Sequence, residues 1–276
     1  MAEFIPGDIK INDIKIHYYR TGGKKPPFLL LHGATDNGLC WAPIAEILSK
    51  QYDVVMPDAQ GHGLSDRLDA RFSFESHTNQ AAGIIRELGL KKPLIMGHSM
   101  GAGTAANLAV EYPSLPKAII LEDPPWGMPA PPDPKNAEEA KKQQEAFRSH
   151  LTGISKLTLE DIIKESRKND PTWAEEERLP WAKAKKQFDT TLFSTMVINP
   201  RSYEEILPRI KCATLLIIAE KGIVSKEAAE NAARIWKSKK PFRWVQIKGA
   251  GHNIRREQFS AFKKALFEFL KLIEDK

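Results

Sequence analysis

The segment Gly97-His98-Ser99-Met100-Gly101 places a serine between two glycines. Apolar residues 93–96 precede it, and small residues dominate positions 101–106 that follow. A strand that turns sharply into a helix here would hold the Ser99 hydroxyl above the strand end. The N–H groups of the helix N-terminus would favour a developing negative charge at that place. We therefore predict that Ser99 is a nucleophile for acyl transfer; the alternative is a glycine-rich structural connection.

A serine hydroxyl is a poor nucleophile until a base removes its proton. The chain has 7 histidines, and only His252 lies in a turn after a late β-rich segment. The carboxyl edge of a parallel sheet would bring it over Ser99, so we predict His252 as the base. His32 and His62 lie in glycine-flanked turns and are expected to be structural. Neither H-x-H nor H-E-x-x-H spacing occurs in the sequence, so no metal site is predicted.

Stabilising an oxyanion takes two backbone N–H donors. The N–H of Met100, directly after the serine, is one candidate. The other is the N–H of Ala34, in the turn His32-Gly33-Ala34 that follows an apolar segment. The alternative for this second turn is a purely structural role.

Short β-rich segments alternate with helical ones, which is typical of an α/β protein with a mostly parallel sheet covered on both faces. A hairpin is predicted over residues 8–19. Buried strands are predicted at residues 27–32, 52–57, 93–97, 118–122, 213–219 and 243–247.

The alternation is interrupted by a proline-rich stretch and a Lys/Glu/Gln-rich helical region. We expect residues 1–123 and 201–276 to form the core, and residues 124–200 to form a helical cap. Thr172 with Glu175, and Ser202 with Glu205, match capping boxes at two helix starts.

Together, His32-Gly33, Pro57-Asp58-Ala59-Gln60-Gly61-His62-Gly63-Leu64-Ser65, residues 97–101 and Gly251-His252 resemble the capped members of the α/β-hydrolase superfamily. The resemblance implies the α/β-hydrolase fold: a mostly parallel eight-stranded sheet flanked by helices, with a helical cap inserted after strand 6. It also implies a nucleophile elbow after strand 5 and no cofactor. Serine at position 99 argues against the branches with an aspartate nucleophile, the dehalogenases and epoxide hydrolases.

The catalytic acid departs from the commonest pattern of this superfamily, which places an aspartate after strand 7. Gly222 stands there in this chain. Some relatives carry the acid at the end of strand 6 instead, and this alignment selects Glu122. Asp123 and Glu220 remain as alternatives, and Asp58 is expected to support a turn.

We expect a substrate pocket rich in aromatic and methionine side chains. These side chains would come from the cap, from its hinge and from the segment just beyond the oxyanion turn. The candidates are Trp41, Trp126, Met128, Trp173, Trp181, Phe188, Phe193 and Met196. The alternative is that most of these side chains form the interface between cap and core. Arg255 and Arg256 could recognise a carboxylate, or pair with Glu257 or a core acid.

The favoured hypothesis is a serine hydrolase that cleaves a small-molecule carboxylic ester or lactone through an acyl-enzyme. The same residues would also suit a C–C bond hydrolase, a perhydrolase or a non-catalytic small-molecule receptor. The net charge of +6 comes without a recognisable nucleic-acid motif, so no nucleic-acid partner is expected. With no signal-like N-terminus and no long apolar run, we expect a cytoplasmic protein without membrane insertion. The sequence leaves a homodimer open.

Overall fold

The fold is built around one sheet of eight strands in the order β1-β2-β4-β3-β5-β6-β7-β8. The computed structural model describes residues 3–73, 75–127, 137–192 and 201–274. The strands are β1 (Ile5–Ile11), β2 (Ile14–Arg20), β3 (Pro27–Leu31), β4 (Asp53–Pro57), β5 (Leu94–His98), β6 (Ala118–Glu122), β7 (Ala213–Lys221) and β8 (Phe242–Gly251). β1 and β2 form an antiparallel hairpin, β2 lies antiparallel to β4, and the remaining neighbours are parallel. The predicted eight-stranded, mostly parallel sheet is confirmed.

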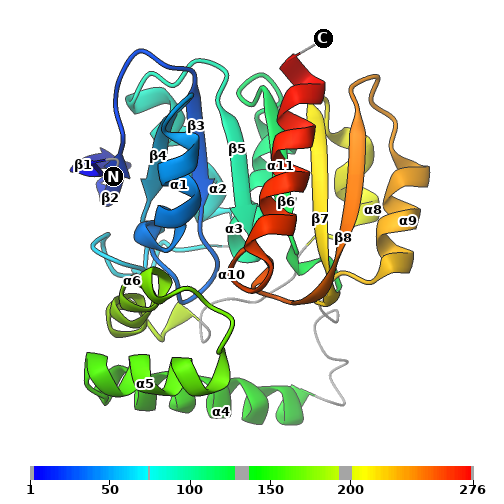
Figure 1. Ribbon diagram of the computed structural model, residues 1–276. Helices are drawn as coiled ribbons and strands as arrows, with labels where there is room; N and C mark the ends of the chain where they lie inside the picture. Colours follow the sequence, from blue (N-terminus) through cyan, green and yellow to red (C-terminus); the bar gives the residue numbers. More distant parts are fainter. Residues whose placement is uncertain (1–2, 74, 128–136, 193–200, 275–276) are drawn as a thin grey trace.

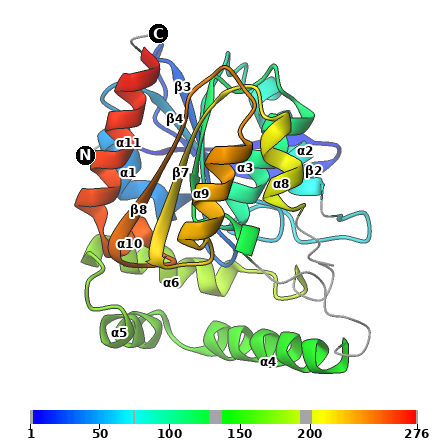
Figure 2. The same cartoon turned by 90° about the vertical axis from the view of Figure 1, so that its right-hand side faces the viewer.

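Helices cover both faces of the sheet (Figures 1 and 2). One face carries α1 (Ala42–Leu48) and α11 (Phe259–Glu274); the other carries α2 (Ser76–Glu87), α3 (Met100–Glu111), α8 (Tyr203–Ile206) and α9 (Lys226–Ile235). Every residue of β4, β5 and β6 is buried, which explains why these strands are nearly continuous apolar runs. The apolar side chains form one large core on each side of the sheet.

Three further helices lie beyond the carboxyl ends of the parallel strands (Figure 1). They are α4 (Ala137–Lys156), α5 (Leu159–Asn169) and α6 (Glu175–Gln187), and we call them the cap helices. No strand occurs in the described parts of residues 124–200. Ser202 caps α8 as predicted, because its side chain accepts a hydrogen bond from the N–H of Glu205. The predicted cap at Thr172 is wrong, since Ala174 precedes the first residue of α6.

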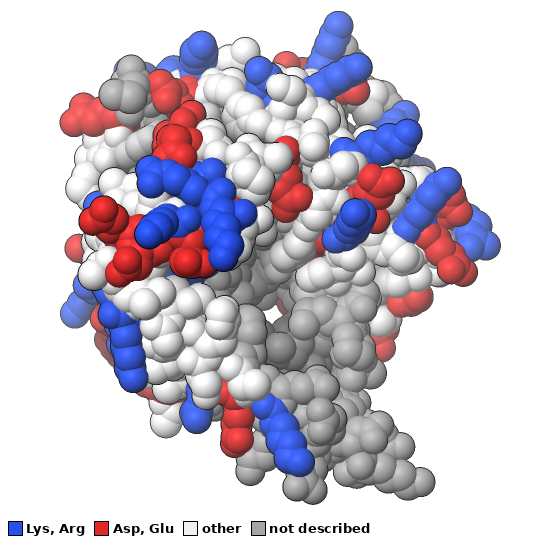
Figure 3. Space-filling model, turned by 60° about the horizontal axis from the view of Figure 1, so that its bottom comes forward, with Lys and Arg blue, Asp and Glu red and all other residues white. Residues whose placement is uncertain are grey.

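The surface at the cap end is mixed in charge. Figure 3 shows lysine and arginine side chains interspersed with aspartate and glutamate over the described part of this face. Over the residues that the structure describes, no helix combines the length and the apolar character needed to cross a membrane.

Candidate active site

Ser99 occupies the sharp turn between β5 and α3, with φ +50° and ψ −116°. This left-handed φ is strained for a residue with a side chain. A Cβ atom at Gly97 would collide with the carbonyl of Gly101, and one at Gly101 would collide with the carbonyl of Leu31. The glycines on either side of Ser99 therefore allow this turn to form, and Ser99 itself is half-buried at its tip.

His252 and Asp123 come together from the ends of two other strands. His252 follows β8 and Asp123 follows β6, and 2.6 Å separates His252 Nδ1 from Asp123 Oδ2. The Asp123 carboxylate is fully buried and also accepts hydrogen bonds from the N–H groups of Ile223 (2.8 Å) and Val224 (3.1 Å). Both carboxylate oxygens are thereby fixed, and the His252 ring is oriented by a charge-assisted hydrogen bond.

Gly222 explains why the carboxylate can come from β6. A Cβ atom at Gly222 would lie 2.5 Å from Asp123 Oδ2 and 2.7 Å from Oδ1, closer than real Cβ contacts allow. At position 222, where the commoner aspartate would stand, the loop after β7 thus has no side chain, and its next two residues donate backbone N–H groups to the carboxylate of Asp123.

The prediction that Glu122 is the hydrogen-bond partner of His252 is wrong. Glu122 Oε1 accepts from the N–H of Arg255 at 2.9 Å, and Oε2 lies 3.2 Å from Arg255 Nη1. Successive side chains point to opposite faces at a strand end, so Glu122 and Asp123 diverge. Burial raises the pKa of Glu122, although the guanidinium of Arg255 opposes this shift. The alternative acid Glu220 accepts a hydrogen bond from the N–H of Gly249 and is exposed.

His98 connects the serine turn to the His252 loop. Its ring lies 4.7 Å from the ring of His252, and its Nε2 lies 3.0 Å from the His252 carbonyl oxygen. Glu257 supports the same loop, since its carboxylate accepts from the N–H groups of Gly251 and Asn253. Within the described residues Ser99 and His252 share no hydrogen bond; such bonds often tighten only when substrate is bound.

The turn after β3 lies beside the serine turn, because Leu31 of β3 pairs with Gly97 of β5. A Cβ atom at Gly33 would meet His98 Nδ1 at 2.6 Å, so the glycine permits close contact. Ala34 and Met100 thus follow the ends of adjacent strands. Their roles as oxyanion donors stay a prediction.

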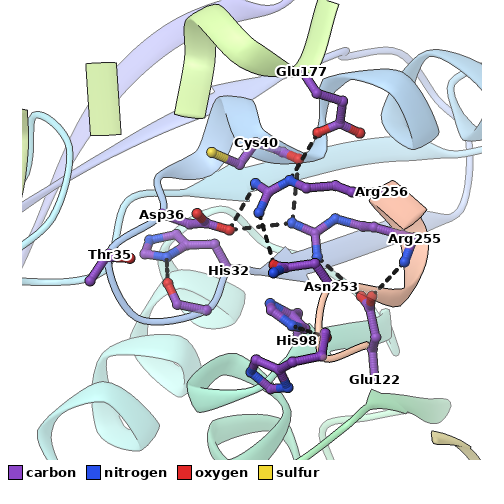
Figure 4. A network of polar contacts seen from close by, with 12 residues as sticks. His32, Thr35, Asp36, Cys40, His98, Glu122, Glu177, Asn253, Arg255 and Arg256 are labelled. Carbon is purple, nitrogen blue, oxygen red and sulfur yellow. Dashed lines mark hydrogen bonds and ion pairs between the residues drawn. The ribbon is translucent and has the colours of Figure 1, made fainter. Parts of the chain in front are cut away.

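A network of buried charges lies beside these turns (Figure 4). Asp36 Oδ2 lies 3.0 Å from Arg256 Nη2 and 3.4 Å from Arg255 Nη2. Its other oxygen lies 3.6 Å from the Nζ of Lys185 on α6. Arg256 Nε also pairs with Glu177 of α6 at 3.2 Å. With the Arg255–Glu122 pair, the network joins the turn after β3, the end of β6, the cap helices and α10 (Ile254–Glu257).

The cations in this network stabilise the ionised form of Asp36. Burial alone would raise the pKa of Asp36, but Arg256, Lys185 and Arg255 outweigh it and hold that pKa below its usual value. Burial lowers the pKa of Lys185. Of the two readings of Arg255 and Arg256, ion pairing with core acids is the one that the structure bears out. No short-range sequence pattern indicates the contact between Asp36 and Lys185, because the two residues lie far apart along the chain.

The predicted pocket residues lie in different surroundings. Trp41 is fully buried on the α1 side of the core, with the Arg255 guanidinium 4.1 Å from its ring centre, so its assignment as a pocket residue is wrong. Phe188 is buried against the ring of His62 at 4.9 Å. Within the cap, Trp173 and Trp181 pack edge to face.

Trp126 packs against Tyr203, with ring centres 5.9 Å apart. Met128, Phe193 and Met196 lie outside the described residues. Because Phe188 packs against His62, it is part of an interface between cap and core, which was the alternative stated for the aromatic residues.

A histidine cluster lies behind the turn after β3. The ring of His62 is 4.9 Å from that of His32 and 6.0 Å from that of His77. Among the residues that the structure describes, no group of three or more His, Cys, Asp or Glu side chains could hold a metal ion.

A mostly parallel sheet with a serine turn after β5, and an Asp–His pair formed at the ends of β6 and β8, is the arrangement of a hydrolase. Residues 26–255 match the family model described as the alpha/beta hydrolase fold, and the chain belongs to this family.

Individual relatives show the same likeness at different coverage. An uncharacterized protein of Mycobacterium tuberculosis is 34% identical over 103 residues, which is 37% of this chain; the match spans only 30% of that relative's length. N-formylmaleamate deformylase of Pseudomonas putida is 25% identical over 98% of both chains. The crystal structure of E-2-(acetamidomethylene)succinate hydrolase superposes with a TM-score of 0.75 at 20% identity, covering 98% of this chain and 100% of the other.

Proposed function

We propose that this protein is a serine hydrolase that cleaves a carboxylic ester or lactone through an acyl-enzyme. The observation that carries the proposal is the 2.6 Å contact of His252 Nδ1 with the buried carboxylate of Asp123, next to the strained turn that holds Ser99. An imidazole held in this way has one tautomer, and its Nε2 is the nitrogen left to accept a proton.

In the proposed reaction, the Ser99 hydroxyl attacks the substrate carbonyl carbon while His252 Nε2 takes its proton. Asp123 stabilises the imidazolium that forms. The N–H groups of Ala34 and Met100 donate to the tetrahedral oxyanion. His252 then protonates the departing alcohol, and the acyl-enzyme on Ser99 remains. A water molecule, deprotonated by His252, hydrolyses this intermediate and restores the Ser99 hydroxyl.

A second candidate is hydrolysis of an N-acyl bond, and the full-length match to N-formylmaleamate deformylase favours it. The two reactions use the same nucleophile and base and differ in the leaving group. An amide nitrogen must be protonated as it departs, so this reaction depends more strongly on the acid form of His252.

The test is a hydrolysis screen across aryl esters of increasing acyl length, lactones and N-formyl amides, with Ser99→Ala as the control. We expect sustained turnover of at least one class, and loss of about 10³-fold or more in kcat for Ser99→Ala. A ligand receptor with this fold would instead stop after about one turnover. Equal hydrolysis by Ser99→Ala would contradict the proposal.

A further inference from the structure

The turn after β3 contains a strained residue. The N–H of Asp36 donates to the carbonyl of Gly33 at 3.2 Å and closes the turn. Thr35, inside this turn, has φ +66°. A β-branched side chain rarely adopts this left-handed conformation, which is strained and persists only where surrounding contacts enforce it. Thr35 directly follows Ala34, the proposed oxyanion donor.

A lysine of the cap helices supplies contacts that hold this residue. Lys185 Nζ donates to the carbonyl oxygen of Thr35 at 2.9 Å and to its Oγ1 at 2.6 Å. It also lies 3.6 Å from Asp36 Oδ1. An ammonium group has three N–H donors, so Lys185 directs its polar contacts at Thr35 and the next residue.

Lys185 is fixed in this position by its surroundings. It is buried, and its Nζ lies 4.7 Å from the centre of the Trp181 ring. The face of an aromatic ring attracts a cation, so this contact stabilises the ammonium group. Moving the ammonium away would leave Asp36 with one cation fewer and the lysine charge without its oxygen partners. A second link runs beside it, since Asn37 Nδ2 donates to Oε1 of Gln187, also on α6, at 2.9 Å.

We propose that Lys185 is a positioning residue for the oxyanion turn: by holding Thr35 in its strained conformation, the cap helix α6 aims the Ala34 N–H at the reacting carbonyl. The cap helices thus contribute to the chemical step besides covering the site. This inference rests on the proposed hydrolase function.

Lys185→Met tests the inference, because it removes the three donors and keeps a long side chain. With an aryl ester, kcat should fall about 10–100-fold while KM stays within about twofold, since the oxyanion forms only after the ground state. Inhibition by an aryl trifluoromethyl ketone, which forms a tetrahedral adduct with serine, should weaken by a similar factor. A lysine with a purely structural role would change the Tm and leave both quantities unchanged in the folded protein.

Thr35→Val is the second variant, because it keeps the side-chain shape and removes only the Oγ1 acceptor. We expect kcat to fall about 3–10-fold at constant KM. If Lys185→Met does not fold, an unchanged kcat in Thr35→Val overturns the inference. Lys186→Met is the matched control: Lys186 Nζ donates to the carbonyls of Ser155, on α4, and Leu157, between α4 and α5, so its loss should leave kcat within about twofold.

The wild-type measurement separates the two proposals. If the wild type shows no turnover that depends on Ser99, the proposed function fails, and the inference fails with it. If such turnover exists and kcat is unchanged in folded Lys185→Met or in Thr35→Val, only the role of Lys185 is overturned.

Discussion

Glu122 and Asp123 are adjacent and both fully buried, yet they have different partners. Glu122 holds the start of α10 through Arg255, whereas Asp123 contacts His252 and two backbone N–H groups. The Glu122 carboxylate, paired with a buried arginine, contributes to the structure. The Asp123 carboxylate, paired with a partly exposed histidine, can contribute to proton transfer. The His252 side chain is 33% exposed, so its ring is accessible from solvent.

Asp123→Asn should lower kcat by about 10³–10⁴-fold, because an amide can neither fix the productive tautomer nor stabilise the imidazolium. Steady-state kinetics on the best ester from the screen measures this loss. Glu122→Gln is the paired variant. It removes one of the two carboxylates that pair with Arg255 and should reduce the free energy of unfolding by about 3 kcal/mol, while kcat of the folded protein stays within about tenfold. The opposite pattern in the two variants would return the acid role to Glu122.

The positions of Ser99 and His252 were predictable from the sequence, whereas the choice of the carboxylate that contacts His252 was not. The Gly-x-Ser-x-Gly segment and the late glycine-flanked histidine are local patterns, and they located Ser99 and His252. The choice between Glu122 and Asp123 depends on where β6 stops, and a shift of one residue reverses the face to which a side chain points. Glu122 pairs instead with Arg255, which lies 133 positions away along the chain, and no local sequence pattern predicts that contact.

At the scale of elements, the loop after β7 is shaped around the Asp123 carboxylate. The strands β6, which precedes Asp123, and β7, which precedes this loop, were predictable because each contains a continuous apolar run. The partners of α6 were not predictable, since its Lys185 and Glu177 contact residues of α10 and of the turn after β3.

Gly222→Ala should disturb the carboxylate, since the added methyl group would meet Asp123 Oδ2 at 2.5 Å. We expect a kcat reduction of about tenfold or more, together with a lower Tm, because the loop or the Asp123 side chain must shift. Gly153→Ala is the control. Gly153 lies on an exposed part of α4 with nothing near its Cβ position, so the change should add about 0.5–1 kcal/mol of stability and leave kcat unaltered. Wild-type kcat in Gly222→Ala would argue against a role for this close contact.

At the scale of the whole molecule, the buried histidine cluster makes stability depend on pH. Burial lowers the pKa of His77 to about 4, and it also lowers the pKa values of His32 and His62. The pKa of an unfolded histidine is about 6.5, so the unfolded chain binds more protons between these values. The stability contributed by keeping these histidines neutral is therefore fully present above about pH 6.5, and it is lost as the pH falls toward 4.

For His77 alone this loss amounts to about 3 kcal/mol once the pH is below both values. Urea unfolding at pH 7 and pH 4.5 measures it. His77→Gln, whose amide can still donate to the Gln60 carbonyl, should reduce the difference between the two pH values by about 2 kcal/mol. His150→Gln, at an exposed position of α4, should keep the wild-type difference. An identical pH response in the His77 variant would show that this histidine does not titrate on unfolding.

The charge network shared by the core and α6 limits how the molecule can be recombined. A chimera that carries helices from another protein in place of α4–α6 would leave Asp36 without Lys185 and Arg256 without Glu177. Unpaired charges in a dry interior are costly, so such a transplant should misfold unless it brings a cation and a carboxylate to the same two places. Replacing these helices in this scaffold therefore requires exchanging α6, the segment after β3 and α10 as one unit.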